Sequence, residues 1–328
     1  MKIIALMPVK NEAWILKTTI PQLIKFADEI LCLDGGSTDG TVDYLKSQGV
    51  FVKNQTEKKT NFSAWRLEAL EWGRERGGTH FIWLDADEAF TTNFLVNKDG
   101  KKNFRNRLSD MKPGEKLAMQ WLCLWKSPYV YRDDMSVWSN LYKDFIIRDD
   151  GKVTFDNTLI HEGRTPGPNF DSEGKLLWKK ISLEEGGVLH FQFVPFERFQ
   201  IKQAYQRARE HSMKTASPRR INNKYSQTLD VPNVQTKSIP KEWLAGINGL
   251  DSISLATDSY YIDSIREFFK EKGILYFEPI QLWQVPELKK IFISEIGREP
   301  HIKTYPAFVV ASKKIYDAIK AKLRNMIR

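Results

Sequence analysis

The sequence predicts an α/β protein with a mostly parallel, Rossmann-like sheet flanked by helices, followed by a helical appendage. Two observations support this fold class. Short apolar runs alternate with segments of helical periodicity through the first 84 residues, which is the order that a parallel sheet requires. After residue 195 the pattern changes to helical spacing without intervening strands.

Four short apolar segments, each followed by turn residues, are the expected strands of the first part: residues 2–9, 29–33, 50–53 and 81–84. The helices expected between them span residues 12–27, 41–48 and 61–76. Pro21 predicts a kink or break in the first helix, because proline lacks the amide hydrogen that continues a helix. Later helices are expected over residues 196–213, 243–247, 260–272, 286–296 and 312–328, with a polar, linker-like break at 222–238.

The composition indicates a folded protein of one large or two modest domains, because 41% of its 328 residues are hydrophobic and 12% are aromatic. We divide the chain into residues 1–215 and a helical region of residues 216–328. Cys32 and Cys123 lie in apolar runs, which favours buried structural thiols over a disulfide. The chain opens without a signal-peptide pattern and has no run of about 18 apolar residues, so a cytoplasmic location is expected.

Positive charge is concentrated at the C-terminus, where residues 289–328 hold ten of the lysines and arginines and only three acids. The expected helix at its end combines a basic face with a short apolar stripe. Such a helix can pack on the body with its charges in solvent, or lie at an anionic membrane surface as a peripheral contact. Nucleic-acid binding is not expected, because no zinc-finger spacing or RNA-binding signature accompanies the charge.

Acidic residues directly follow the fourth expected strand, with Asp85 and Asp87 two positions apart. In an extended backbone their side chains project to the same side. Two carboxylates placed in this way can bind a divalent cation and leave positions open for a phosphate. The alternative is an acidic turn that caps the next helix.

Three strand-end loops, residues 8–12, 34–40 and 85–88, are expected to meet at one edge of the sheet, where ligands bind in this fold class. Asp34 can accept hydrogen bonds from a nucleobase or ribose, whereas the Ser-Thr-Asp sequence after it can simply cap the next helix. Arg66 can pair with a diphosphate, or it can be a surface charge. The joint position of the three loops favours a binding site.

Four motifs together give the sequence a resemblance to the family 2 glycosyltransferases, which have the GT-A fold. They lie at residues 7–12, 33–41, 64–66 and 84–88, in the order and spacing of that family. The resemblance is clear over residues 1–95 and looser to about residue 215. Beyond Asp87 the pattern is similar to the small bacterial lipopolysaccharide-core glucosyltransferases, on the basis of His161-Glu162 and a later strand histidine, His190.

The resemblance implies a role for each motif residue. The nucleotide pocket would be lined by Pro8, Asn11, Glu12 and Asp34. Arg66 would meet the diphosphate or the sugar, and Asp85 the ribose and the metal. The metal, Mn²⁺ or Mg²⁺, would be bound by Asp85 and Asp87, with His190 as a further ligand.

The implied reaction is inverting transfer of a sugar from a nucleotide donor, with UDP-sugars favoured, to a glycan or glycolipid hydroxyl. An inverting displacement needs a base that deprotonates the acceptor; Glu162 is the first candidate and Asp144 the second. Trp138 and Trp178 are candidates for stacking on an acceptor sugar.

Two other functions are compatible with such a nucleotide-binding core. A nucleotidyltransferase typically shows a glycine-rich, basic phosphate loop after the first strand, whereas residues 7–12 contain no glycine. A non-catalytic nucleotide-sugar-binding protein is disfavoured by the presence of Asp85, Asp87 and Arg66.

Overall fold

The computed structural model describes residues 1–57, 61–96, 104–134, 139, 141–152, 154–155, 164–225, 234–255 and 260–301. Within these residues a nine-stranded sheet forms the centre of the molecule, in the order β3-β2-β1-β4-β8-β6-β10-β5 with β9 beside β6. Its strands are β1 (Ile3–Val9), β2 (Glu29–Asp34), β3 (Phe51–Asn54), β4 (His80–Trp83), β5 (Glu88–Phe90), β6 (Lys116–Cys123), β8 (Tyr142–Arg148), β9 (Trp178–Lys180) and β10 (Gly187–His190).

The predicted α/β class is confirmed. The sheet is mixed, however, and not purely parallel. Strands β1 to β4 are parallel to one another, as the alternation of strands and helices predicts. Strand β8 runs antiparallel to both β4 and β6, and β5 runs antiparallel to β10. The direction of these later strands depends on long-range pairing, for which the sequence carries no local signal.

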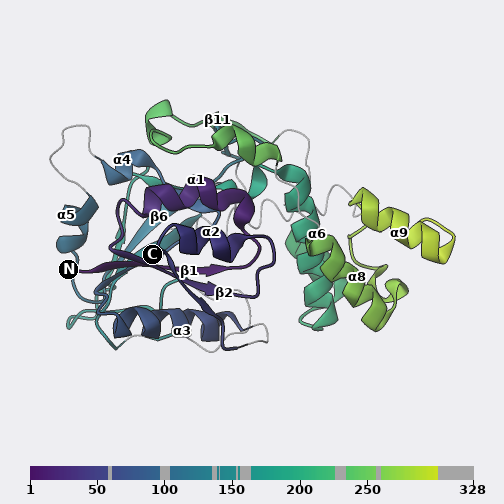
Figure 1. Cartoon of the computed structure of the whole chain (residues 1–328), viewed down its shortest axis with the longest axis horizontal. Coiled ribbons are helices and arrows are strands. Elements are labelled where there is room, and N and C mark those ends of the chain that lie inside the picture. The colour runs from purple at the N-terminus through teal and green to yellow at the C-terminus, as the bar shows by residue number, and fades with distance from the viewer. Residues whose placement is uncertain are drawn as a thin grey trace.

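Helices cover both faces of the sheet (Figure 1), and the alternation of side chains along β1 explains why. Ile3, Ala5 and Met7 pack into one core with the apolar side of α1 (Ala13–Leu23). Ile4 and Leu6 point to the other face and pack into a second cluster with α3 (Phe62–Glu75). Because β1 is buried on both faces, its sequence is a continuous run of apolar residues.

The other helices of the α/β part are short: α2 (Thr41–Ser47), α4 (Thr92–Leu95), α5 (Phe104–Ser109) and the 3₁₀ turn η1 (Phe191–Phe193). Helix α1 continues through Pro21 and ends at Leu23, so the helix is shorter than the predicted span 12–27. None of the helices among the described residues is both long and apolar enough to cross a membrane.

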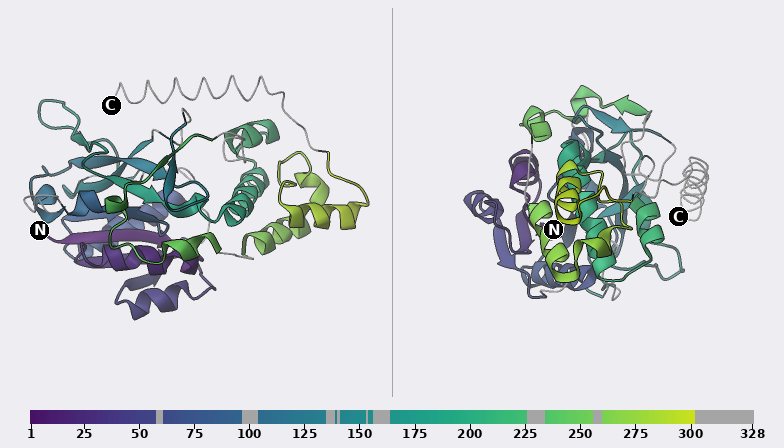
Figure 2. Two further views of the ribbon diagram at one scale, coloured as in Figure 1. Left: turned by 90° about the horizontal axis from the view of Figure 1, so that it is seen from above. Right: turned by 90° about the vertical axis from the view of Figure 1, so that its right-hand side faces the viewer.

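A group of helices with its own apolar core lies at one end of the molecule (Figure 2). It contains α6 (Phe196–Ser212), α7 (Pro218–Tyr225), α8 (Tyr260–Lys272) and α9 (Pro286–Ile296), with the 3₁₀ turn η5 (Ile274–Phe277). The 3₁₀ turns η3 (Lys241–Trp243) and η4 (Leu250–Leu255) instead lie against α4 and α1, on the sheet core. Phe199, early in α6, packs in the sheet core, whereas Ala204 and Ala208 pack in the helical core. Helix α6 is therefore shared by the two cores.

Two predictions about this region were wrong. The expected linker begins inside α7, because Ile221 and Tyr225, four positions apart, pack into the helical core. The same linker also contributes strand β11 (Thr236–Ser238), which pairs with β7 (Val130–Arg132). Residues 243–247 do not form an α-helix; the 3₁₀ turn η3 ends at Trp243, the first of them. The bounds predicted for α8 and α9 are confirmed, and residues 312–328 lie outside the described residues.

We expect His80, at the start of β4, to make the protein less stable in acid. Its side chain is 3% exposed, Nε2 donates to the carbonyl oxygen of Leu108 at 3.0 Å, and burial lowers its pKa to about 4. An unfolded histidine has a pKa near 6.5, so the unfolded state takes up the proton first as the pH falls. The contribution of neutral His80 to the free energy of unfolding is therefore present above about pH 6.5 and is lost as the pH falls toward 4.

The measurement is the free energy of unfolding in urea at pH 7 and pH 5, for wild type and His80→Gln. Between these pH values, wild type should lose about 2 kcal/mol more than the variant, which has no imidazole to protonate. Equal losses in the two proteins would contradict the assignment of this acid sensitivity to His80.

Candidate functional site

The strand-end loops predicted to form a site do meet at one edge of the sheet. Val9 at the end of β1 pairs with Asp34 at the end of β2, and β4 pairs with β1 on its other side. The loops that follow these three parallel strands therefore begin side by side. Pro8 lies within β1, half-buried and opposite Leu33.

The loops after β1 and β2 are joined by hydrogen bonds. The Asn11 amide donates to Ser37 Oγ at 2.9 Å, and the Thr38 amide donates to Asn11 Oδ1 at 2.8 Å. The Ala13 amide donates to Asp39 Oδ2 at 3.0 Å. Asn11 adopts a positive φ of 54°, a conformation that asparagine tolerates better than most residues. The two loops thus form one connected surface.

Asp34 organises the glycine turn that follows it. Its carboxylate accepts hydrogen bonds from the amides of Gly36 at 3.0 Å and Ser37 at 3.1 Å, and from Ser37 Oγ at 2.5 Å. Gly36 has a φ of 87°, which a side chain would strain. In this structure Asp34 is engaged within its own loop and shapes the surface beside Asn11.

The acidic segment after β4 is a turn, which corrects the expectation that Asp85 and Asp87 project together from extended backbone. Glu88 Oε2 accepts the Asp85 amide at 2.8 Å, and the Glu88 amide donates back to the Asp85 carbonyl at 3.1 Å. The turn leaves the Asp85 side chain 41% exposed and buries that of Asp87 to 6%. The two carboxylates therefore have different partners.

Asp87 faces His190, whose position is set by the pairing of β5 with β10. Asp87 Oδ2 lies 3.6 Å from His190 Nε2, and the Phe191 amide donates to the Asp87 carbonyl at 2.9 Å. The imidazole stacks on Trp121, with ring centroids 4.1 Å apart and 19° between the planes. Burial lowers the pKa of His190 although Asp87 opposes this, so the ring is neutral near pH 7.

Asp87 and His190 fit the chemistry of a divalent-cation site. Among the described residues, Asp87 Oδ2 and His190 Nδ1 are buried atoms without a hydrogen-bond partner. Burial would raise the pKa of Asp87, but the neighbouring groups that lower it, of which the Lys202 ammonium is the strongest, outweigh burial and keep the carboxylate ionised. No group of three or more ligating side chains occurs in the described part of the chain, so protein ligands there would supply only part of a coordination shell.

Asp85 is paired with Arg164 at 2.8 Å between Oδ2 and Nη2, and the same guanidinium contacts both carboxylate oxygens of Glu88 at 2.5 Å. Partial burial would raise the pKa of Asp85, but Arg164 and Arg66 outweigh it and lower the pKa. Arg66, half-buried on α3, therefore lies near the acidic turn. Sequence reasoning did not single out Glu88 or Arg164.

Two cations from α6 approach this site, and sequence reasoning missed both. Lys202 Nζ lies 3.8 Å from Asp87 Oδ2 and 4.0 Å from Glu12 Oε1. Arg198 Nη2 lies 3.8 Å from Glu12 Oε2. Glu12 also accepts from Trp14 Nε1 at 2.6 Å, and burial raises the pKa of its carboxyl although Lys202 opposes this. The only sequence signal was the i, i+4 spacing of Arg198 and Lys202 in a predicted helix.

Comparison with known proteins connects this site to a family. Residues 4–97 match the sequence profile of glycosyl transferase family 2. We refer to residues 4–97 as the family 2 region. The region contains the loops after β1 and β2, α3 and the acidic turn, whereas His190 and Lys202 lie outside it. No protein with a curated description matches the chain.

Solved structures give partial matches. One is glucosyl-3-phosphoglycerate synthase from Mycobacterium tuberculosis with Mn²⁺, uridine diphosphate and glucosyl-3-phosphoglycerate, at 21% identity and a TM-score of 0.24, covering 26% of this chain and 34% of that one. Another is mannosyl-3-phosphoglycerate synthase from Rubrobacter xylanophilus, at 19% identity and a TM-score of 0.27, covering 39% of this chain and 41% of that one. The matches thus span less than half of each neighbour's length.

Several predicted residues are not among the contacts that form this site. Glu162, His161 and Trp138 lie outside the described residues, as does the basic helix expected at 312–328. Asp144, on β8, accepts from Trp178 Nε1 at 2.6 Å and from Thr165 Oγ1 at 3.4 Å. Each oxygen of Asp144 thus accepts one hydrogen bond, and Trp178, a predicted stacking residue, is held in place by its indole N–H.

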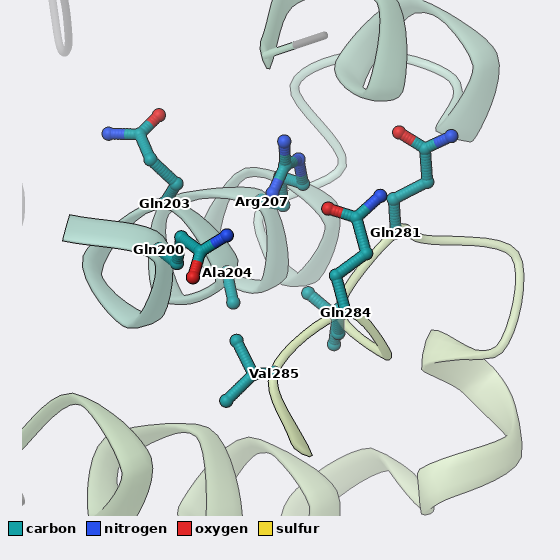
Figure 3. A pocket seen from close by; sticks show the side chains of 8 residues that line it. Gln200, Gln203, Ala204, Arg207, Gln281, Gln284 and Val285 are labelled. Carbon is teal, nitrogen blue, oxygen red and sulfur yellow. The ribbon is translucent and has the colours of Figure 1, made fainter. Parts of the chain in front are cut away.

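A groove of about 1770 Å³ separates the family 2 region from the helical end of the molecule. Asn11, Trp14 and Asp39 line one side, and Phe196 and Tyr260 line the other. A second pocket, within the helical core, is lined by four glutamines and Arg207 (Figure 3). Its volume of about 10 Å³ has room for only about one water molecule, whereas the groove is large enough for a substrate.

Proposed function

We propose that this protein is an inverting, metal-dependent glycosyltransferase that moves a sugar from a nucleotide-sugar donor, with UDP-sugars favoured, to a hydroxyl of a glycan or glycolipid. The observation that carries the proposal is the pair formed by ionised Asp87 and neutral His190 at the edge of a family 2 region. Asp87 follows β4, which lies beside β1, so the pair is at the sheet edge where α/β proteins bind nucleotides.

In this proposal the nucleotide lies against the loops after β1 and β2, beside Pro8, Glu12 and Asp34. Asn11 Nδ2 is buried and has no hydrogen-bond partner among the described residues, so it can donate to a nucleotide without losing an internal bond. Arg66 lies near the acidic turn, where a guanidinium can pair with a diphosphate.

Asp87, His190 and Asp85 are the residues that would hold Mn²⁺ or Mg²⁺. The bound ion would act as a Lewis acid that stabilises the departing nucleoside diphosphate. Glu162 remains the proposed base, because the alternative, Asp144, already accepts hydrogen bonds from Trp178 and Thr165. A general base typically contributes about 10²–10⁴-fold to the rate.

Thermal unfolding with UDP, GDP, ADP, CMP and dTDP, with and without Mn²⁺, tests the donor site. One nucleotide should raise the melting temperature only when Mn²⁺ is present, because the metal would supply positive charge for its phosphates. A ligand held at 100 times its dissociation constant adds about 2.7 kcal/mol of stability, which is readily measured. Asp87→Ala should abolish the shift, and Asp43→Ala, which removes an exposed carboxylate on α2, should leave it intact.

Two outcomes would contradict the proposal in different ways. If no nucleotide stabilises wild type with or without the metal, the chain has no donor site of this kind. If a nucleotide stabilises wild type and Asp87→Ala equally, a nucleotide site exists but the metal dependence is wrong.

A further inference from the structure

Lys202 is a cation from outside the family 2 region that approaches two acids of the proposed donor site. Its side chain is 17% exposed, and Nζ lies 3.8 Å from Asp87 Oδ2 and 4.0 Å from Glu12 Oε1. Both distances exceed hydrogen-bond length, so the ammonium interacts with the two carboxylates through charge. A lysine side chain has four rotatable bonds and can exchange one anionic partner for another.

The same carboxylate oxygen faces both Lys202 and His190. Asp87 Oδ2 is 3.8 Å from Lys202 Nζ and 3.6 Å from His190 Nε2. A divalent cation held by Asp87 and His190 would therefore lie close to the ammonium, and the two positive charges would repel each other. A diphosphate entering the site supplies negative oxygens that can neutralise both.

We propose that Lys202 couples the binding of the divalent cation to the binding of the donor diphosphate. Without ligands its ammonium balances Asp87 and Glu12; with the donor bound it pairs with a diphosphate oxygen instead. This inference rests on the proposed function, because it requires a nucleoside diphosphate and a cation at this site. Its consequence is that each ligand binds weakly alone and the two bind tightly together.

Replacing Lys202 with methionine tests the effect of its charge on the binding of the cation and of the diphosphate. Methionine keeps much of the side-chain volume and removes the charge. Mn²⁺ alone should bind more tightly to Lys202→Met than to wild type, because the competing ammonium is absent. UDP in the presence of saturating Mn²⁺ should bind about 10–100-fold more weakly, the usual range for losing a hydrogen bond to a charged group. The two affinities thus change in opposite directions.

Free Mn²⁺ can be titrated by electron paramagnetic resonance, with and without UDP, and the ratio of the two dissociation constants measures the coupling. Allosteric couplings of this kind are commonly about 5–150-fold, and Lys202→Met should reduce the ratio toward one. Lys202→Arg keeps the charge and should retain most of the coupling. Lys290→Met, which removes an exposed lysine on α9, is the matched control and should behave like wild type.

Other results would overturn the inference. If wild type binds UDP with Mn²⁺ and Lys202→Met leaves the coupling unchanged, Lys202 has no such role and the proposed function still stands. If Lys202→Met and Lys202→Gln both weaken Mn²⁺ and UDP alike, the lysine has only a structural role. If wild type binds neither ligand, both the inference and the proposed function fail.

Discussion

Arg164→Met is expected to lower the free energy of unfolding by about 3–5 kcal/mol, the usual cost of removing one partner from a buried ion pair. Arg164 contacts both carboxylate oxygens of Glu88 at 2.5 Å, and the Glu88 side chain is 0% exposed. Without the guanidinium, Glu88 would keep only its hydrogen bonds from Trp121 Nε1 and the Asp85 amide. Urea unfolding at neutral pH measures the loss.

Two controls separate charge from packing. The double variant Glu88→Gln with Arg164→Met removes both charges and should recover most of the lost stability, because a glutamine oxygen can still accept from Trp121. Arg266→Met breaks an exposed pair with Glu287 and should cost only about 0–1 kcal/mol. A double variant as unstable as Arg164→Met would show that lost packing, and not the unpaired Glu88, causes the effect.

His190→Ala is expected to lower kcat for sugar transfer by about 10²–10³-fold, the usual effect of removing one group that stabilises charge in the transition state. His190 is the nitrogen ligand that faces Asp87 in the proposed cation site. The assay measures nucleotide release from UDP-sugars at saturating Mn²⁺, with His190→Gln as a variant that keeps a ligating oxygen and should retain part of the rate.

The matched control for this substitution is His211→Ala. His211 lies in α6 within the helical end of the molecule, where Nε2 donates to the Tyr276 carbonyl at 3.1 Å. Its removal should affect stability and leave kcat close to that of wild type. If His190→Ala keeps the wild-type kcat with Mn²⁺ present, His190 does not act on the leaving group.

The N-terminal half of the site could be predicted because its signals are local. Apolar runs mark the strands, and polar residues directly after them mark the edge where Asn11, Asp34 and Asp87 meet. The relation between Asp85 and Asp87 could not be predicted in the same way. It depends on the Glu88 carboxylate accepting the Asp85 amide, and this hydrogen bond converts the expected extended segment into a turn.

The rest of the site depends on contacts between distant parts of the chain. Lys202 reaches Asp87 across 115 positions, and Arg164 reaches Glu88 across 76. Neither contact leaves a pattern in the neighbouring residues. The sequence around Lys202 does not differ from that around an ordinary lysine on a helix, and the sequence around Arg164 does not differ from that around an ordinary arginine in a loop. The antiparallel course of β8 was unpredictable for the same reason.

Helix α6 connects the candidate site to the helical core of the molecule. Its first turns are anchored among the aromatic rings around Phe199, its later turns hold Ala204 and Ala208 against α8, and Lys202 lies between the two anchors. A ligand that restrains Lys202 would therefore restrain the part of α6 that connects the two cores. Amide hydrogens of α8 should exchange more slowly when a nucleotide is bound beside Lys202, so that slow exchange in α8 would report on occupancy of the site.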